Sequence, residues 1–494
     1  MSLRTALPCL LIAAVPLSAQ TPQFITLPDK SPLVTVRVVF RTGAASDPKG
    51  KEGLAAMTAA LLAEGGTQKL TYDQVVDALY PMAVNVAYQV DKEMTTFSAD
   101  THVDNLDAFY AIFRAMLLEP GWRAEDLKRL KDQTVNYIRV NLRANNDEEL
   151  GKEVLYNVIY SGGHPYGHLN VGNTSTVESI TVDDLKTFWR ANYTRANLTV
   201  GLAGGYPPAF AERVKKDFGG LAAGRRAPAT RPAPPKVEGL NLHIVEKQTR
   251  SVAYSFGFPF DVKRGHPDYL ALLVAQSFLG PHRNSSGLLY QNMREIRGLN
   301  YGDYAYIEYF PRGMFQFEPD PNLARPQQIF QIWIRPVEVP TAHFALRLAF
   351  HEVDRFIKKG LTPAEFEQAR NYVAKNVNLL TKTKRAELGY AIDSAYYGIP
   401  EYNRYVTEGL KKLTADDVTR AIRKHLQLQN VQVVAVASDA EGLKKQLLSN
   451  EPSPMKYASE KPKELLEEDK TIEKRVLPFK AGKTEIIRVD RLFE

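Results

Sequence analysis

Cysteine is nearly absent from this sequence. The 494 residues include one cysteine, Cys9, which lies in an apolar run near the N-terminus. The rest of the chain can therefore form neither disulfides nor thiolate metal sites. An exported protein without cysteine suits an oxidising compartment such as a bacterial periplasm.

Long apolar runs are also missing. No stretch of 18 apolar residues follows the N-terminus, so we expect no membrane span. The first 20 residues, MSLRTALPCLLIAAVPLSAQ, join one Arg, a short apolar run and small residues at Ser18 and Ala19. This pattern predicts a signal peptide over residues 1–19 and export to the periplasm of a Gram-negative bacterium. A membrane anchor is the alternative, but the run is shorter than the ~20 residues that a span needs.

Clusters of basic residues are the third absence. The formal net charge is +7, yet Lys and Arg are scattered and do not alternate with aromatics. This distribution disfavours a nucleic-acid partner. The content of 44% hydrophobic and 24% charged residues is typical of a folded globular protein.

The sequence does contain an internal repeat. The motif TVDDL begins at Thr181, and Asn197 precedes an apolar strand sixteen residues later. The motif TADDV at Thr414 stands at the same distance from Asn430 and a second apolar strand. Thr is a good N-cap, and Asp favours the first helical turn. Each motif therefore predicts a helix followed by a strand.

Two further pairs of segments keep the same order. AEDLKRLKDQTVNYI from Ala124 parallels AEFEQARNYVAKNV from Ala364, and VTVRVVFRTG parallels SVAYSFGFPF. Three ordered matches predict a duplicated α+β unit. The Pro-rich segment GRRAPATRPAPP favours an extended linker between the copies. The expected parts are a signal peptide, a first half, a linker, a second half and a C-terminal extension, at residues 1–19, 20–223, 224–236, 237–448 and 449–494.

The C-terminal extension leaves two interpretations open. Its charged segment KPKELLEEDKTIEKR indicates exposure to solvent, whereas TEIIRVDRLFE alternates like a strand. The strand could dock on the body of the protein or on a partner, or the extension could be a solvated tail.

The nine histidines do not form an obvious metal site. HPYGH places His164 and His168 four residues apart, but Pro165 and Gly167 disfavour a helix there, so we interpret HPYG as a structural turn. His343 and His351 are eight residues apart, too far to share one ion on a helix. The pattern His-x-x-Glu-His occurs nowhere in the chain.

The order of these segments resembles the insulinase and mitochondrial-processing-peptidase family of zinc metallopeptidases. The resemblance rests on the strand VTVRVVF, the helix in GLAAMTAALLAEGG, the HPYG turn and the strand ending in LAGG. It implies an α+β fold in which two homologous α/β-sandwich halves, each an antiparallel-rich mixed sheet covered by helices, form half of a clamshell chamber.

In that family the first helix carries His-x-x-Glu-His. Residues i and i+4 share a helix face, so both imidazoles reach one zinc, and the Glu accepts a proton from zinc-bound water. The resemblance places these roles at Ala56, Ala59 and Ala60, and the later Glu ligand at Asn136 or Tyr137. Methyl groups neither ligate a metal nor accept a proton. We therefore expect no metal and no cofactor in this chain.

The second half keeps a different pair of residues. The family pattern L-R-E-x-x-G-L-x-Y is matched by MREIRGLNY, with Met293 for the usual Leu. The resemblance makes Arg294 and Tyr301 the pair that binds substrate carbonyls and the developing oxyanion of a partner's active site. The alternatives are a solvated helix-end cation and an ordinary strand aromatic. Arg297 is a competing candidate, four residues from Tyr301.

These observations predict the non-catalytic subunit of a heterodimeric zinc metallopeptidase. The partner would carry His-x-x-Glu-His and the zinc, and peptides would be the substrates. The alternative is a non-proteolytic subunit of a larger complex, either structural or peptide-binding, which includes a peptide-binding homodimer.

Overall fold

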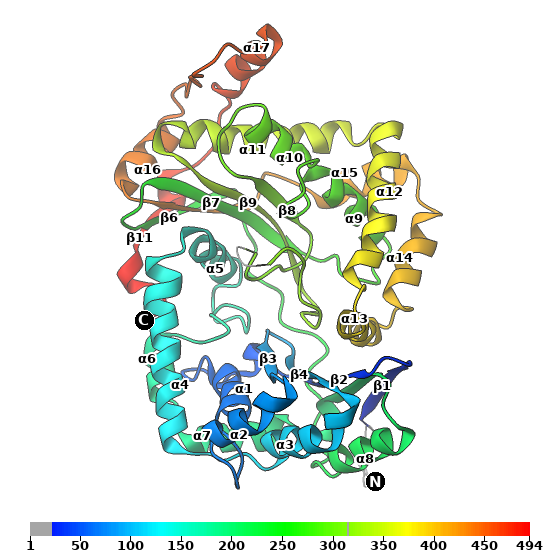
Figure 1. Cartoon of the computed structure of the whole chain (residues 1–494). Helices are drawn as coiled ribbons and strands as arrows, with labels where there is room; N and C mark the ends of the chain where they lie inside the picture. Colours follow the sequence, from blue (N-terminus) through cyan, green and yellow to red (C-terminus); the bar gives the residue numbers. More distant parts are fainter. Residues whose placement is uncertain (1–21, 314–315) are drawn as a thin grey trace, which may run out of the picture.

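The computed structural model describes residues 22–313 and 316–494, so the predicted signal peptide lies outside the described residues. The chain forms two halves, each a mixed sheet with helices packed against it (Figure 1). The predicted α+β class with two homologous halves is confirmed. None of the described helices is long and apolar enough to cross a membrane.

The first sheet is built by the N-terminal half. Its strands are β1 (Gln23–Pro28), β2 (Leu33–Phe40), β3 (Ala87–Val90), β4 (Thr95–His102) and β5 (Leu198–Gly204). They stand in the order β1-β5-β2-β4-β3. The β1–β5 pair is parallel and the other pairs are antiparallel.

The second sheet repeats this arrangement. Its strands are β6 (Leu240–Glu246), β7 (Ser251–Phe260), β8 (Asp303–Tyr306), β9 (Gln328–Glu338), β10 (Val431–Ala437) and β11 (Thr484–Arg488). The order β6-β10-β7-β9-β8 has the same directions as the first sheet, with β11 added in parallel beside β6. The duplication inferred from the sequence is therefore confirmed in the topology.

Helices connect the strands in both halves. In the first half they are α1 (Leu54–Glu64), α2 (Tyr72–Leu79), α3 (Leu106–Leu118), α4 (Ala124–Asn136), α5 (Asp147–Ile159), α6 (Thr174–Ser179), α7 (Val182–Asn192) and α8 (Pro208–Gly219). In the second half they are α9 (Tyr269–Leu279), α10 (Leu288–Tyr290), α11 (Ala342–Lys359), α12 (Pro363–Leu380), α13 (Lys384–Tyr397), α14 (Tyr402–Leu410), α15 (Ala415–His425) and α16 (Ala440–Ser449). The last helix is α17 (Lys463–Ile472).

The repeated Thr motifs begin helices as predicted. Thr181 caps α7 and Thr414 caps α15, each in a reciprocal capping box with the Asp three residues later. The hydroxyl accepts a backbone N–H that the helix leaves unpaired, and the Asp accepts the N–H of the Thr. The following strands, β5 and β10, lie at equivalent places in the two sheets.

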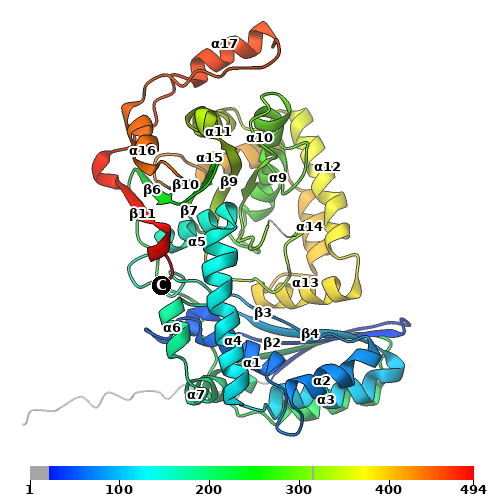
Figure 2. The same ribbon diagram turned by 60° about the vertical axis from the view of Figure 1, so that its left-hand side comes forward.

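One helix of each half packs on the sheet of the other half. Helix α5 packs on β7 and β10 of the second sheet, and α13 packs on β5 and β1 of the first. In β10, Val433 belongs to the large core of the second half, whereas its neighbour Val434 packs in the cluster that contains α5. Both faces of the strand are therefore buried, which accounts for the apolar run from Val433 to Ala437. The two halves are interlocked (Figures 1 and 2).

The C-terminal extension docks on the body of the protein rather than forming a solvated tail. Thr484–Arg488 forms β11 beside β6. The segment 450–480 includes α17, which projects at the top of Figure 1, but its residues Ile472, Leu477 and Phe479 join the core of the second half.

The linker at residues 224–236 has no regular secondary structure, and the body of the protein holds it in place. Arg231 donates two hydrogen bonds to the buried carboxylate of Glu93, at 2.7 and 2.8 Å.

Candidate functional site

Helix α1 places its alanines between the two halves. Gly53 precedes the helix with φ of +95°, and a Cβ there would lie 2.5 Å from the carbonyl oxygen of Val171, so only glycine fits without a shift. Ala56 and Ala60 lie one turn apart and line a pocket of about 520 Å³. Ala59 points into the core and is fully buried.

The second predicted ligand position faces the same pocket. Tyr137 lines it and Asn136 does not. Tyr137 begins a π-helical segment, η4 (Tyr137–Ala144), that continues α4. π-Helical turns are uncommon and recur at functional sites. The structure therefore brings Ala56, Ala60 and Tyr137 to one pocket, whereas Ala59 and Asn136 do not line it.

The pocket beside Ala56 is also lined by carboxylates that the sequence analysis did not predict as site residues. Glu153 of α5 lines it, and burial raises the pKa of its carboxyl to about 7, while nearby Lys92 opposes that shift. Glu64 also lines the pocket, and burial raises its pKa above the usual range against the pull of Arg129. Neither Glu153 nor Glu64 falls in a helix segment with a recognisable ligand pattern, so spacing along the sequence could not identify them.

Two clusters elsewhere have ligand-like side chains. Among the described residues, the groups close enough to share a metal are His266 with Asp268 and His425, and His351 with Glu352 and Glu468. No member of either group lines the pocket beside Ala56. Ion pairs already engage their carboxylates: Asp268 bonds Lys424 at 2.7 Å, and Glu468 bonds Arg297 at the same distance.

The HPYG turn has a structural role. His164 Nδ1 accepts the backbone N–H of Tyr166 at 3.0 Å, and Nε2 lies 2.9 Å from the carbonyl oxygen of Pro232 in the linker. His168 lies 3.3 Å from Asp47, whose carboxylate also accepts the N–H groups of Gly53 and Ala55 at the start of α1. These contacts hold α1 and the linker in place.

Arg294 and Tyr301 lie next to each other on the second half. Arg294 belongs to a π-helical turn, η6 (Gln291–Glu295), and Gly298, which follows it, has a φ of +68° in the left-handed region. Nη1 of Arg294 donates to the carbonyl oxygen of Tyr301 at 3.2 Å, and the guanidinium lies 5.7 Å from the ring of Tyr301. Tyr301 lies just before β8 rather than inside it.

The phenol of Tyr301 is open to another molecule. Tyr301 is 74% exposed, and the Arg294 side chain is 37% exposed. The competing candidate, Arg297, is fully buried and pairs with Glu468 and Asp469 of α17. Arg297 therefore has no free donor face, whereas Arg294 and Tyr301 do.

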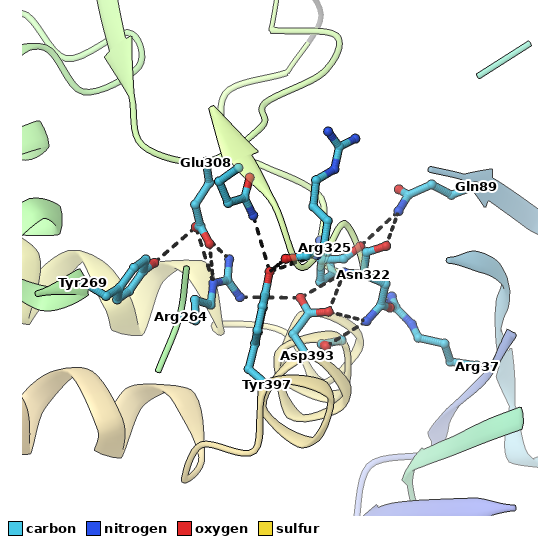
Figure 3. Close-up of polar contacts among 12 residues, drawn as sticks. Arg37, Gln89, Arg264, Tyr269, Glu308, Asn322, Arg325, Asp393 and Tyr397 are labelled. Atoms are coloured by element: carbon cyan, nitrogen blue, oxygen red, sulfur yellow. Dashed lines mark hydrogen bonds and ion pairs between the residues drawn. The ribbon is translucent and has the colours of Figure 1, made fainter. Parts of the chain in front are cut away.

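Buried polar contacts that no sequence pattern indicated join the two halves. Arg325 donates to both oxygens of Asp91 at 3.1 and 2.5 Å. Arg37 donates to Asn322 at 2.6 Å (Figure 3). Asn322 in turn donates to Asp393 at 3.1 Å. The partners are more than 200 residues apart except for the last pair, so no local pattern could reveal them.

These contacts predict a stability effect. Replacing Arg325 with Ala leaves the Asp91 carboxylate buried without its counterion, and we expect the free energy of unfolding to fall by about 3–5 kcal/mol. Arg385→Ala removes a half-exposed pair with Asp100 between the same halves and should cost below about 1 kcal/mol. Urea unfolding of both variants measures the difference, and equal losses would contradict the role of Arg325.

The fold and the pocket together define the class of this protein. Two interlocked copies of one sheet-and-helix unit enclose a pocket lined by the methyl groups of Ala56 and Ala60 and by the phenol of Tyr137. The duplicated unit and the pocket between its copies are the features that comparison with known proteins can test.

Comparison with known proteins identifies the family. Residues 24–166 match the family described as insulinase (peptidase family M16), and residues 179–373 match the one described as the peptidase M16 inactive domain. The chain belongs to the M16 family.

Relatives support this assignment. A Helicobacter pylori protein named non-peptidase homolog YmxG is 21% identical over 417 residues, which cover 82% of this chain and 89% of the relative. The structure of a peptidase M16 inactive domain from Pseudomonas fluorescens has a TM-score of 0.73 at 21% identity, covering 85% of this chain and 96% of that one. The structure of a Helicobacter pylori protease has a TM-score of 0.71 at 15% identity, covering 85% and 98%.

Proposed function

We propose that this chain is the non-catalytic subunit of a two-chain zinc metallopeptidase. The observation that carries the proposal is the contrast between the two candidate sites. The pocket at the ligand positions presents Ala56, Ala60 and Tyr137, whereas Arg294 and Tyr301 are paired and exposed. A homologous partner with His-x-x-Glu-His would hold the zinc, and this chain would supply a chamber wall and two donors.

The chemistry of the pair suits that role. Arg294 offers a fixed cation with several N–H donors, and Tyr301 offers a neutral O–H. Such donors stabilise the negative charge that develops on a peptide carbonyl oxygen during hydrolysis. The N-terminal pattern further supports export, so we place the complex in the periplasm.

Purification from the native host tests this proposal. We expect the tagged chain to bring with it a homologous chain that bears His-x-x-Glu-His, with about one zinc per pair. The pair should cleave internally quenched peptides, and the isolated chain should not. Cleavage by the isolated chain, or a pair without zinc, would refute the proposal.

One observation favours a second function. A structure of complex III2 from Candida albicans matches with a TM-score of 0.66 at 14% identity. A chain of this fold therefore also occurs in an assembly whose name does not refer to proteolysis. Co-purification with a large assembly that cleaves no peptide would favour a structural role for this chain.

A further inference from the structure

The C-terminal arm, which we define as residues 450–480, contacts the turn that carries the exposed Arg–Tyr pair. Its helix α17 is the only helix of the arm among the described residues, and it projects at the top of both views (Figures 1 and 2). Ile472, Leu477 and Phe479 of the arm join the core of the second half. Its inner face is not free. Leu465, Asp469 and Ile472 are buried, and α17 packs on α11.

Two acidic residues of α17, Glu468 and Asp469, bind Arg297, the residue that precedes Gly298. Arg297 is fully buried; its Nε donates to Asp469 at 2.9 Å and its Nη2 to Glu468 at 2.7 Å. The remaining nitrogen, Nη1, donates to the carbonyl oxygen of Asn292 in η6 at 3.1 Å. The side chain therefore ties the arm to the helical turn in which Arg294 lies.

Further hydrogen bonds hold the segment around Arg297 and the two carboxylates that bind it. Lys461 of the arm donates to the carbonyl oxygen of Ile296 at 2.8 Å. Tyr457 donates to Asp469 at 2.5 Å, and Arg355 of α11 donates to Glu468 at 3.2 Å. The carboxylates that bind Arg297 are thus held in place by groups from the arm and from the body.

The turn itself joins the two proposed functional residues. The N–H of Gly298 donates to the carbonyl oxygen of Arg294 at 2.8 Å, and the N–H of Leu299 donates to that of Met293 at 3.0 Å. Tyr301 follows three residues after Gly298. The backbone between Arg294 and Tyr301 therefore passes through the segment that the arm holds.

We propose that the arm positions Arg294 and Tyr301 through the ion pairs of Arg297 with Glu468 and Asp469. This inference rests on the proposed function, because it assigns Arg297 as a positioning residue for that site. Donors that are held in place before reaction stabilise a transition state more than mobile donors do. Without the arm, Arg297 would be a buried cation without its counterions, and the turn would relax toward solvent.

Amide hydrogen exchange on the isolated chain tests the contact without any partner. We expect Asp469→Asn to increase the exchange rates of Gly298 and Leu299 by about tenfold, since the turn opens more often. Glu467→Gln is the matched control, because Glu467 lies on the same helix and pairs with Lys470 alone at the surface. Unchanged exchange at Gly298 and Leu299 in Asp469→Asn would overturn the inference.

Turnover by the purified two-chain complex tests the functional part. We expect Asp469→Asn to lower kcat about tenfold on an internally quenched peptide, with zinc content and subunit stoichiometry unchanged. The same substitution added to the double variant Arg294→Ala and Tyr301→Phe should lower kcat no further, because a positioning effect requires the side chains that are positioned. Glu468→Gln provides a milder second variant if Asp469→Asn folds poorly, and Arg297→Lys should keep part of the activity.

The outcomes separate this inference from the proposed function. If Arg294→Ala has full activity, the proposed function fails. If Arg294→Ala is impaired but the loss from Asp469→Asn multiplies with that of the double variant Arg294→Ala and Tyr301→Phe, the arm has only a structural role and the inference alone fails.

Discussion

Replacing Arg294 with Ala is expected to lower kcat of the two-chain peptidase about 100-fold. The loss corresponds to about 2.7 kcal/mol of transition-state stabilisation, which is typical for one oxyanion donor. Tyr301→Phe keeps the ring and removes only the O–H, so we expect a smaller loss of about tenfold. KM should change little in both variants if the donors act mainly on the transition state. Steady-state kinetics on an internally quenched peptide measures both effects.

Matched controls distinguish this role from a general loss of charge or aromatic surface. Arg370→Ala removes another Arg, which forms a surface pair with Glu367 on α12, and should leave kcat unchanged. Tyr80→Phe removes the hydroxyl of a tyrosine that is also mostly exposed but lies in the first half of the protein. Wild-type kinetics for both Arg294→Ala and Tyr301→Phe would remove these residues from the site.

The sequence predicted the repeated unit because its signals are local. Thr181 and Thr414 begin helices through contacts with residues three positions away, and the strands that follow each have a continuous apolar run. Capping and periodicity act within a few residues, so they can be read along the chain. The order of such signals then indicated a duplicated topology, which the two sheets confirm.

The interlocking of the halves could not be predicted in this way. Helix α5 buries charged residues, such as Glu148 and Lys152, beside apolar ones, and nothing in its sequence indicates that it packs on the sheet of the other half. Likewise, Asp91 and Arg325 are ordinary charged residues in the sequence, and they become a buried pair only when the halves meet. Long-range contacts of this kind depend on the complete fold.

The site was predicted in part. The structure places Ala56, Ala60 and Tyr137 around one pocket, and their assignment to metal-ligand positions stays a prediction from the resemblance. The π-helical turns that contain Tyr137 and Arg294 were not expected, because one extra residue per turn leaves no mark in apolar periodicity. The choice between Arg294 and Arg297 also required the structure, since it depends on α17.

Restoring metal ligands to the pocket is expected to create a zinc site. In the triple variant Ala56→His, Ala60→His and Tyr137→Glu, two imidazoles lie one helical turn apart and a carboxylate faces them from η4. The pocket of about 520 Å³ has room for these side chains and a water. We expect one Zn²⁺ per chain, with affinity at least about 100-fold above wild type, or about 2.7 kcal/mol. Isothermal titration of the isolated chain measures it.

The double variant Ala56→His and Ala60→His is the control for the carboxylate. It keeps both imidazoles but lacks the third ligand, so we expect weaker binding than in the triple variant. Ala59 is fully buried, and for this reason the general base is not part of the design; the triple variant should bind zinc without hydrolysing peptides. A folded triple variant that binds no zinc would show that the pocket no longer has the geometry of a metal site. Stoichiometric zinc in the wild-type chain would show that alanine has not removed the site at all.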